Sequence, residues 1–285
     1  MSKICFLIAA HKNQGQLLRL INHLKKDFDI YVHIDKKSKL NLKNFDNVKF
    51  YKKYKVYHAE VSQIISTLFL INEAYKNNYD RYIFISGQDL PLKNNNYIQN
   101  FFDNNLYNEY ISYYQVNSVE SGEIFDIQNF SRVRNYNFEG LTRKILHSSI
   151  RYFISNLNVT KKKIKYDIYY GSSWWNLTNN AIEYILNYLN KYKHFMNQFK
   201  NVWGSDEYFF QSILLNSEFK NKCVNNNLRY IDWSGQKGSS PKTFTIKDYN
   251  DIKNNINDNL FARKFDENID NDIIDKLYKD LENSN

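Results

Sequence analysis

The stretch KICFLIAA, Lys3–Ala10, is a short and almost continuous apolar run, and it decides the fold. A polar turn follows it, and next comes NQGQLLRLINHLKK (13–26), whose Leu and Ile residues are spaced as on one face of a helix. An apolar run of this length before a turn is typical of a strand that is buried on both faces. We therefore predict a buried strand followed by a helix that packs on the sheet.

The same alternation continues through the first third of the chain. We predict strands at 29–35, 48–56 and 81–92 and a long amphipathic helix at 59–77. The last of these strands breaks at Gly87 and is stopped by Pro91. The order strand, helix, strand, strand, helix, strand indicates an α/β sheet with helices on its faces.

Polar side chains follow three of these strands, namely His11, Asp35 and Asp89. Each of them alone is more often a turn or cap residue. Ligands of α/β sheets, however, gather outside the carboxyl ends of the strands. Three polar groups at one edge therefore favour a nucleotide site.

The middle of the chain is harder to interpret. Residues 126–153 are rich in aromatic side chains and Arg but have poor periodicity, so we expect a long crossing segment that is partly helical. Beyond it the pattern again predicts regular elements: strands at 167–178, 227–234 and 243–246, helices at 179–192 and 202–214, and a short apolar run with two cations at 260–265. From Asp266 onward acids outnumber bases, which predicts a solvated terminal helix and tail.

Composition limits the class of protein. The 285 residues are enough for one large domain, and the net charge of +9 comes mostly from Lys residues scattered along the chain. A nucleic-acid reader usually concentrates its Arg and Lys in one footprint, so we expect no nucleic-acid partner. Cys5 and Cys223 are too few for a disulfide framework and indicate free buried thiols in a reducing compartment. The apolar run at the start is too short for a signal peptide or a membrane span, so we expect a cytoplasmic protein.

The stretch VWGSDEYFFQSIL (202–214) carries adjacent carboxylates, Asp206 and Glu207, at the entrance of an apolar helix. Ser205 and Asp206 are suited to capping the helix, because their oxygens accept its first free N–H groups. Glu207 then falls in the first turn with its longer side chain free to reach outward. By sequence alone, helix capping and chemistry remain equally open for this pair.

Seven segments, in order, resemble one family, the core-2/I-branching β-1,6-N-acetylglucosaminyltransferases and the related protein xylosyltransferases. The segments are AHK, VHIDKKS, SGQDLPL, GSSWWNLT, SDEYFFQSIL, LRYIDW and LFARKFD. The resemblance covers the chain from the first strand to about Asp266. The family's membrane-anchored stem and luminal disulfides are not found in this sequence, which suggests a bacterial-type, cytosolic relative.

The resemblance implies a GT-A fold, which is a Rossmann-like mixed central sheet flanked by helices. It implies a single catalytic domain over 1–285, with a nucleotide-binding half (1–115), an acceptor and catalytic half (116–265) and a terminal helix and tail (266–285). It also implies a UDP-sugar donor, inversion at the anomeric carbon and catalysis without a metal or other cofactor. The residues agree on the metal: where metal-dependent enzymes of this fold carry Asp-x-Asp, this chain has Ser86-Gly87-Gln88-Asp89, with a single carboxylate.

The resemblance also implies roles for individual residues. Glu207 falls on the family's catalytic base, while Asp206 is expected to be structural and to line the substrate site. Without a metal, cations must neutralise the departing diphosphate. Lys264 matches one of the family's two basic residues; for the other we favour Lys242, with Lys237 and Arg263 as alternatives.

The remaining positions concern donor and acceptor. Asp35 is expected to contact the uridine, Asp89 the donor sugar or ribose, and His58 the nucleotide, although Tyr57 is an alternative for this last position. Trp233 is expected to stack on the acceptor sugar, although a buried core role is as common for Trp. The floor under both substrates is expected to consist of Gly171, Ser172, Ser173, Trp174 and Trp175. Arg132 and Arg134 would meet either an acidic acceptor or solvent.

These expectations combine into one function. The chain is expected to transfer N-acetylglucosamine from UDP to a hydroxyl of a surface glycan, such as capsule, O-antigen or lipooligosaccharide. The acceptor would be lipid-linked, with peripheral contact at the cytoplasmic face of the inner membrane. The alternatives are a xylosyl- or glucosyltransferase of the same fold and a carbohydrate-binding protein without turnover.

Overall fold

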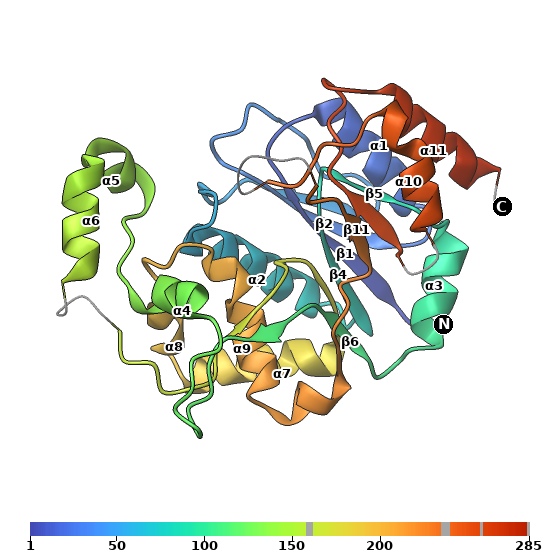
Figure 1. The fold of residues 1–285 in the computed structure, drawn as a ribbon. Coiled ribbons are helices and arrows are strands. Elements are labelled where there is room, and N and C mark those ends of the chain that lie inside the picture. The colour runs from blue at the N-terminus through green and yellow to red at the C-terminus, as the bar shows by residue number, and fades with distance from the viewer. Residues whose placement is uncertain (158–161, 235–239, 257–258, 284–285) are drawn as a thin grey trace.

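The computed structural model describes residues 1–157, 162–234, 240–256 and 259–283 and contains a central seven-stranded mixed sheet (Figure 1). Its strands follow the spatial order β10-β6-β9-β4-β1-β2-β3. β4, β1, β2 and β3 run parallel, whereas β9 lies antiparallel between β4 and β6. The bounds are β1 (Ile4–Ala10), β2 (Asp29–Ile34), β3 (Val48–Tyr51), β4 (Arg81–Ser86), β6 (Glu109–Ile111), β9 (Trp175–Thr178) and β10 (Cys223–Val224). This sheet and its helices confirm the expected Rossmann-like mixed α/β architecture.

Alternate residues of β1 pack into two different cores. Phe6 and Ile8 face a core that includes the buried side of α1, while Cys5 and Leu7 face a core that includes α2. This is the pattern expected of a central strand that helices cover on both faces. The helices of these layers are α1 (Gln14–Leu24), α2 (Val61–Tyr75), α3 (Asn95–Asp103), α7 (Asn179–Lys191) and α9 (Phe209–Leu215).

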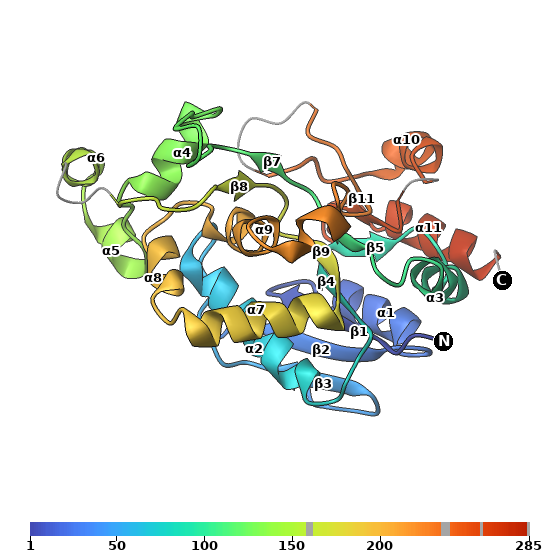
Figure 2. The same ribbon diagram turned by 90° about the horizontal axis from the view of Figure 1, so that it is seen from below.

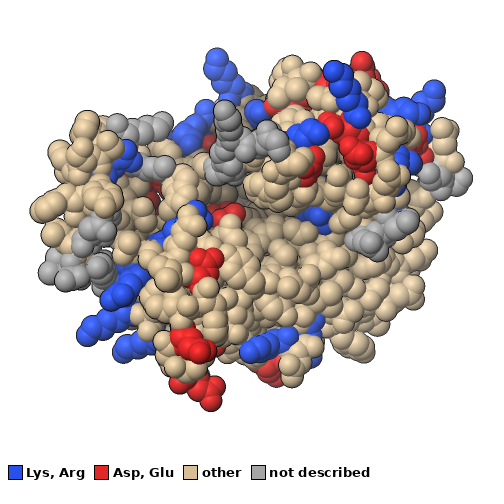
Figure 3. Space-filling model, in the orientation of Figure 1, with Lys and Arg blue, Asp and Glu red and all other residues tan. Residues whose placement is uncertain are grey.

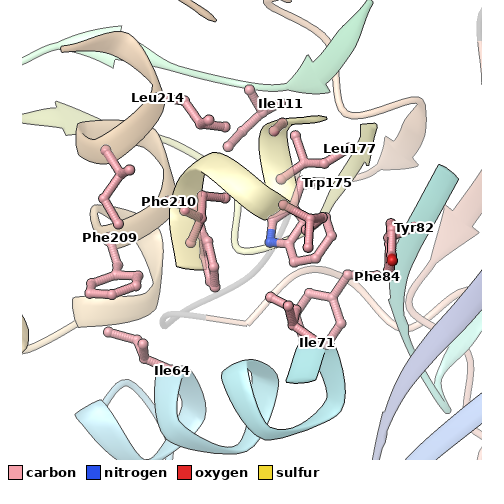
Figure 4. Close-up of a cluster of buried hydrophobic side chains, with 14 of the residues drawn as sticks. Ile64, Ile71, Tyr82, Phe84, Ile111, Trp175, Leu177, Phe209, Phe210 and Leu214 are labelled. Carbon is pink, nitrogen blue, oxygen red and sulfur yellow. The ribbon is translucent and has the colours of Figure 1, made fainter. Parts of the chain in front are cut away.

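The α2 side of the sheet holds a core dense in aromatic side chains. Figure 4 shows Trp175 from β9 between Phe84 of β4 and Phe210 of α9. The ring centroids of Trp175 lie 5.3 Å from those of both Phe84 and Phe210. Trp175 is fully buried, so the first half of the chain and the catalytic half predicted at 116–265 share one sheet and one core.

A smaller sheet lies beside the central one. It has the order β11-β12-β5, in which β12 pairs parallel with β11 and antiparallel with β5. Its core joins Leu90, Ala262 and Phe265 to the C-terminal helices. The bounds here are β5 (Asp89–Pro91), β11 (Arg229–Ile231), β12 (Phe261–Arg263), α10 (Tyr249–Asn254) and α11 (Asp272–Glu282), with the 3-10 turn η4 at Ile246–Asp248.

The remaining elements surround the end of α2 and α9. They are α4 (Ile127–Arg134), α5 (Gly140–Ile145), α6 (Ser148–Asn156), α8 (Phe195–Phe199), the 3-10 turns η2 (Ser205–Glu207) and η3 (Glu218–Lys222), and the two-stranded pair β7 (Tyr114–Gln115) and β8 (Tyr169–Tyr170). Figures 1 and 2 both show α5 and α6 at the far left, farthest from the central sheet.

Several expected elements differ in extent. β3 ends at Tyr51, and the strand predicted at 167–178 is two strands, β8 and β9, because residues 171–174 form an irregular link. The helix predicted within 202–214, with Ser205 and Asp206 as its caps, begins instead as the turn η2 and becomes α-helical only at Phe209. The strand expected at 243–246 is wrong: Thr245 caps η4 through a reciprocal pair of bonds with Asp248.

Both cysteines are free thiols, Cys5 buried and Cys223 half-buried. In the described parts of the chain, no helix combines the length and apolar character needed to cross a membrane. Basic and acidic side chains are both dispersed over the face shown in Figure 3, apart from the residues drawn in grey.

Candidate active site

The carboxyl edge of the parallel strands brings His11 and Asp35 together. The backbone N–H of Asp35 donates to the carbonyl of Ala10 at 2.8 Å, so the two strand ends stay in register beyond β1 and β2. The Asp35 carboxylate accepts from the N–H groups of Lys37 (2.9 Å) and Val56 (3.2 Å) and keeps its second oxygen near the Lys37 ammonium. Partial burial, followed by the charges of Lys12 and Lys264, lowers the pKa of His11. The two predicted edge residues therefore adjoin the cations near the C-terminus.

Asp89 is enclosed rather than open to a ligand. Its carboxylate is fully buried, accepts from the Ser86 hydroxyl at 2.6 Å and lies 2.7 Å from Nη1 of Arg263. Nε of the equally buried Arg229 lies 3.7 Å away. A direct contact with a donor sugar would require one of these partners to leave. In this structure Asp89 orients Arg263.

Arg263 and Lys264 form a pair of neighbouring cations beside Trp174. The Arg263 guanidinium lies 4.5 Å from the centroid of the Trp174 ring, and its Nη1 donates to the Ser86 hydroxyl and to the Asp89 carboxylate. Lys264 is half-buried, and its pKa is lowered by burial and then by the charges of Arg263 and Lys12. The neighbouring positive charges of Arg263 and Lys264, with Lys12 close by, create a site for an anion.

The other predicted cations have different surroundings. The backbone segment that carries Lys242 lies close to Lys264, because the N–H of Phe244 donates to the Lys264 carbonyl at 2.8 Å. Its ammonium, however, lies 2.6 Å from Asp248 and 3.5 Å from Asp232, which occupy it in this state. Lys237 lies outside the described residues.

The loop before α9 places Asp206 and Glu207 at the surface of the aromatic core. Gly204 adopts a left-handed conformation (φ 77°), and its N–H donates to the Ala59 carbonyl at 2.7 Å. A Cβ at Gly204 would lie 3.0 Å from Oε2 of Glu207. Glycine is thus required at this bend both for its dihedral angle and for the space that it leaves to the carboxylate.

Asp206 is buried, and it does not cap the helix as expected. Its Oδ2 accepts from the Ser173 hydroxyl at 2.6 Å and from Nε2 of Gln63 at 3.1 Å, while its Oδ1 has no partner among the described residues. Ser205 likewise makes no cap, and its hydroxyl is buried without a partner in the described structure. Burial raises the pKa of Asp206, and the bond from Ser173 opposes this shift.

Glu207 also has a perturbed carboxyl group. Burial, and then the neighbouring charge of Asp206, raises the pKa of Glu207 to about 8. The Tyr170 hydroxyl bonds to the carboxyl group, and the Arg132 charge opposes the shift. A carboxyl group whose pKa lies near neutrality can take a proton from an alcohol more readily than an ordinary one.

Residues 171–174 connect the carboxylates to the cations. The N–H of Gly171 donates to the Glu207 carbonyl at 2.8 Å, Ser173 binds Asp206, and Trp174 stacks on Arg263. A Cβ on Gly171 would lie 1.8 Å from the Ser112 carbonyl oxygen, so only glycine fits here. Ser172 faces the same strand end, since its N–H donates to the Ser112 hydroxyl at 3.0 Å. The loop before α9 (200–208), which carries Glu207 and is called the base loop below, and the cations Arg263 and Lys264 therefore adjoin the same link.

His58, Tyr57 and Trp233, the flanking side chains singled out from the sequence, do not all lie at the carboxylate end of the site. His58 meets Trp203 edge-on at 5.8 Å between ring centroids, and its charge acts on Asp206, so it lies at the carboxylate end. Tyr57 is the alternative to His58 for the nucleotide contact. The Lys37 ammonium lies over its ring, 4.0 Å from the centroid, and also pairs with Asp35. Trp233 is 59% exposed and is therefore not a core residue.

Sequence reasoning missed two groups at the carboxylate end. Tyr170 bonds to Glu207, and Gln63 of α2 bonds to Asp206. Neither belongs to a recognisable motif, although GSSWW follows Tyr170 directly. Arg132 of α4 and the Tyr208 hydroxyl both donate to Oδ1 of Asn129, and the Arg132 charge acts on Glu207, whereas Arg134 is exposed. Within the ranges that the structure describes, no group of three or more His, Cys, Asp or Glu side chains is arranged to hold a metal ion.

Comparison with known proteins gives consistent matches. The family model described as "Branch: Core-2/I-Branching enzyme" matches residues 4–256. Among curated proteins, xylosyltransferase 1 of Homo sapiens is 23% identical over 302 residues, which cover 96% of this chain and 30% of that protein. Beta-glucuronosyltransferase GlcAT14A of Arabidopsis thaliana is 29% identical over 121 residues, or 41% of this chain and 26% of the relative. The chain thus spans about a quarter to a third of the length of these relatives.

Solved structures give weaker matches. A197 from STIV aligns with 64% of this chain and 67% of its own at 10% identity and a TM-score of 0.29. HddC from Yersinia pseudotuberculosis aligns with 64% of this chain and 79% of its own at 15% identity and a TM-score of 0.28. Similarity at this level carries no argument about function.

Proposed function

The chain belongs to the Core-2/I-branching enzyme family, and on this premise we propose that it is an inverting glycosyltransferase that uses a UDP-sugar. The proposal rests on one observation. Glu207, a carboxyl group with a pKa raised to about 8, is joined through residues 171–174 to the cations Arg263 and Lys264. A proton acceptor and an anion site within one region are the two requirements of a single displacement at a sugar carbon.

The proposed reaction is one concerted step. The acceptor hydroxyl attacks the anomeric carbon on the face opposite the diphosphate, and Glu207 takes its proton. The C–O bond to UDP breaks, and UDP leaves with its negative charge facing Lys264 and Arg263. Asp206 is proposed to act indirectly: its buried negative charge helps to raise the pKa of Glu207.

Cations that belong to the protein support the proposal of a metal-independent reaction. Burial and then the charges of Arg263 and Lys12 lower the pKa of Lys264, and the charge of Asp266 opposes this shift. An incoming diphosphate supplies further negative charge. Lys242 would join if Asp248 and Asp232 released it, and Trp174 together with Asp89 holds Arg263 in place.

For the donor we propose UDP-N-acetylglucosamine first. The names of the curated relatives favour a second candidate, UDP-xylose or UDP-glucuronic acid. We propose a hydroxyl of a surface glycan as acceptor, with the exposed Trp233 as a stacking platform for its sugar. A lipid-linked acceptor and peripheral contact with the inner membrane from the cytoplasm complete the proposal. Binding of carbohydrate without turnover is the alternative.

The test is single-turnover release of UDP from a UDP-sugar in the presence of EDTA. Glu207→Gln keeps the shape of the side chain and removes its basicity, so we expect a loss of about 10²–10⁴-fold in rate with donor binding retained. Glu218→Gln, an exposed carboxyl group outside the site, is the matched control and should match the wild type. Equal rates for Glu207→Gln and the wild type would leave the protein a binder rather than an enzyme at this site.

Donor and metal are tested together by thermal denaturation with UDP-N-acetylglucosamine, UDP-xylose, UDP-glucuronic acid, UDP-glucose and a GDP-sugar. We expect UDP compounds to raise the melting temperature with EDTA present, because ligands that bind only the folded state stabilise it. Stabilisation only after Mn²⁺ is added would contradict the metal-independent reaction while leaving the transferase proposal standing.

A further inference from the structure

A cavity lies beside the base loop, outside the site described above. Its volume is about 260 Å³, and it is lined by Tyr136, Phe138, Ser148, Arg151, Tyr152 and Trp203, together with Asn137. We propose that this cavity is a subsite for one acidic sugar residue of the acceptor, bound through its carboxylate to Arg151. The inference rests on the proposed function, and it adds the chemical class of the acceptor.

The helix α6 is oriented so that its polar side faces the cavity. Successive residues of an α-helix are turned by about 100°, so Ser148, Arg151 and Tyr152 share one side, while Ile150 and Phe153 point the opposite way. The first three line the cavity, although Tyr152 is still 75% exposed, and the last two are exposed by 49% and 67%. Of the three lining residues, Arg151 is the one that is partly buried.

Arg151 is the group that selects for charge. Its Nε is buried and has no hydrogen-bond partner among the described residues. Buried donors are normally satisfied, so the guanidinium keeps a donor that no acceptor in the described structure uses. A carboxylate matches the fork of guanidinium donors better than a neutral hydroxyl does.

The rest of the lining suits a sugar ring. Tyr136 and Phe138 meet edge-to-face with centroids 5.1 Å apart, and they present aromatic surface with Trp203. Aromatic faces accept the C–H side of a pyranose, while Ser148 and Asn137 offer polar groups to its hydroxyls. The volume is below the roughly 300–1,000 Å³ of pockets for drug-sized ligands, which suits a single ring rather than a longer glycan.

The position of the cavity links it to the reaction. Trp203 immediately precedes Gly204, the bend that leads to Glu207, and the N–H of Asn137 donates to the Asn201 carbonyl at 2.8 Å. The cavity wall and the base loop are thus fixed to each other. The lining does not include Arg263 or Lys264, the cations proposed to face the donor, so we assign this cavity to the acceptor.

The experiment measures binding of two small probes, methyl glucuronide and methyl glucoside, by ligand-observed NMR titration of the full chain. The probes differ only in the carboxylate at C6. We expect methyl glucuronide to bind at least fivefold more tightly, and Arg151→Met to reduce it to the affinity of methyl glucoside. Phe153→Ser, on the outer side of the same helix, is the matched control and should retain the preference.

Equal binding of the two probes, or a preference that survives Arg151→Met, would overturn the proposal. Arg151→Lys separates a charge effect from a folding effect: it should restore part of the preference if the variant protein is folded. The transferase proposal is tested separately, by comparing UDP release from Glu207→Gln and the wild type. If Glu207→Gln matches the wild type while the probe preference depends on Arg151, the cavity remains an acidic-sugar site on a binding protein.

Discussion

At the carboxyl edge of the central sheet the large and charged side chains are enclosed, whereas in residues 119–157 many apolar side chains face solvent. Asp89 and the Arg229 side chain are fully buried and paired with each other's charge. In the second region the exposed large hydrophobic residues are Val119, Ile124, Phe125, Ile127, Ile145, Ile150, Tyr152, Phe153 and Leu157. The sheet edge is thus enclosed, whereas residues 119–157 bury few of their large apolar side chains, Val133 among them.

Residues 119–157 depend more on hydrogen bonds to backbone groups. The Glu139 carboxylate accepts from the N–H groups of Val61 (3.3 Å) and Asn201 (3.0 Å), and Glu60 accepts from the N–H of Gly140 at 2.8 Å. These bonds tie the segment to the start of α2 and to the base loop. The comparison teaches that changes at the sheet edge should act on folding, while changes in 119–157 should act on ligands.

The largest expected effect is that of Asp89→Asn. The substitution removes a buried negative charge and leaves the guanidinium of Arg229 without its ion-pair partner, and Arg263 loses its anchor. Breaking a buried pair in this way costs about 3–5 kcal/mol of unfolding free energy. Chemical denaturation monitored by circular dichroism measures it.

The control is Asp46→Asn, which removes the partner of Lys25 from a pair whose Asp side chain is 70% exposed. Here the unfolding free energy should change by less than about 1 kcal/mol, because exposed pairs contribute little. If both substitutions cost the same, burial does not distinguish the sheet edge from the surface.

The next effect is that of Gly171→Ala in the link between the two sides of the site. The added Cβ would lie 1.8 Å from the backbone oxygen of Ser112, so the strand ends must separate. Overpacking of this kind costs about 3 kcal/mol and should also slow UDP release, since Gly171 holds the Glu207 carbonyl.

Gly122→Ala is the control that isolates the steric component of the Gly171→Ala effect. Gly122 has a φ of 72° but no neighbour within 4 Å of its added Cβ, so only the dihedral preference is lost. We expect a cost of about 1–2 kcal/mol at Gly122. A smaller effect at Gly171 than at Gly122 would mean that the link can move aside.

The fold was predictable where burial follows a simple period. The strand at 4–10 and the helix at 14–24 lie where the apolar pattern puts them, because the strand alternates between two cores and the helix buries one apolar face in a single core. The helices α4–α6 could not be bounded, since their apolar residues do not mark a buried face.

The site was predictable only as far as local motifs reach. The pairing of Asp89 with Arg229 joins residues far apart in sequence, and no local pattern contains it. For the same reason the bonds of Tyr170 to Glu207 and of Gln63 to Asp206 were not foreseen. The role of Glu207 as base stays a prediction, and its environment is what makes it testable.

A more moderate effect is expected on the pH dependence of kcat/KM, which reports on Glu207 in the base loop between the two regions. Glu207 acts as a base only when deprotonated, and burial with the Asp206 charge raises its pKa to about 8. Log kcat/KM should therefore rise by about one unit per pH unit below that value and level off above it, which is about 1.4 kcal/mol per unit. Asp206→Asn removes the second cause and should move the midpoint to lower pH. A flat profile through neutrality, or an unmoved midpoint, would contradict the coupling.

The smallest effect is expected on the outer face of α6. Phe153 is 67% exposed, so Phe153→Ser should leave the unfolding free energy within about 0.5 kcal/mol of the wild type. Val133 of α4, in the same segment, is fully buried, and Val133→Ala should cost roughly 2 kcal/mol, because it opens a cavity. Urea denaturation of both variants compares the two positions directly. A large loss for Phe153→Ser would show that the outer face of α6 is covered in solution, and the contrast between the two regions would then be one of partners rather than of burial.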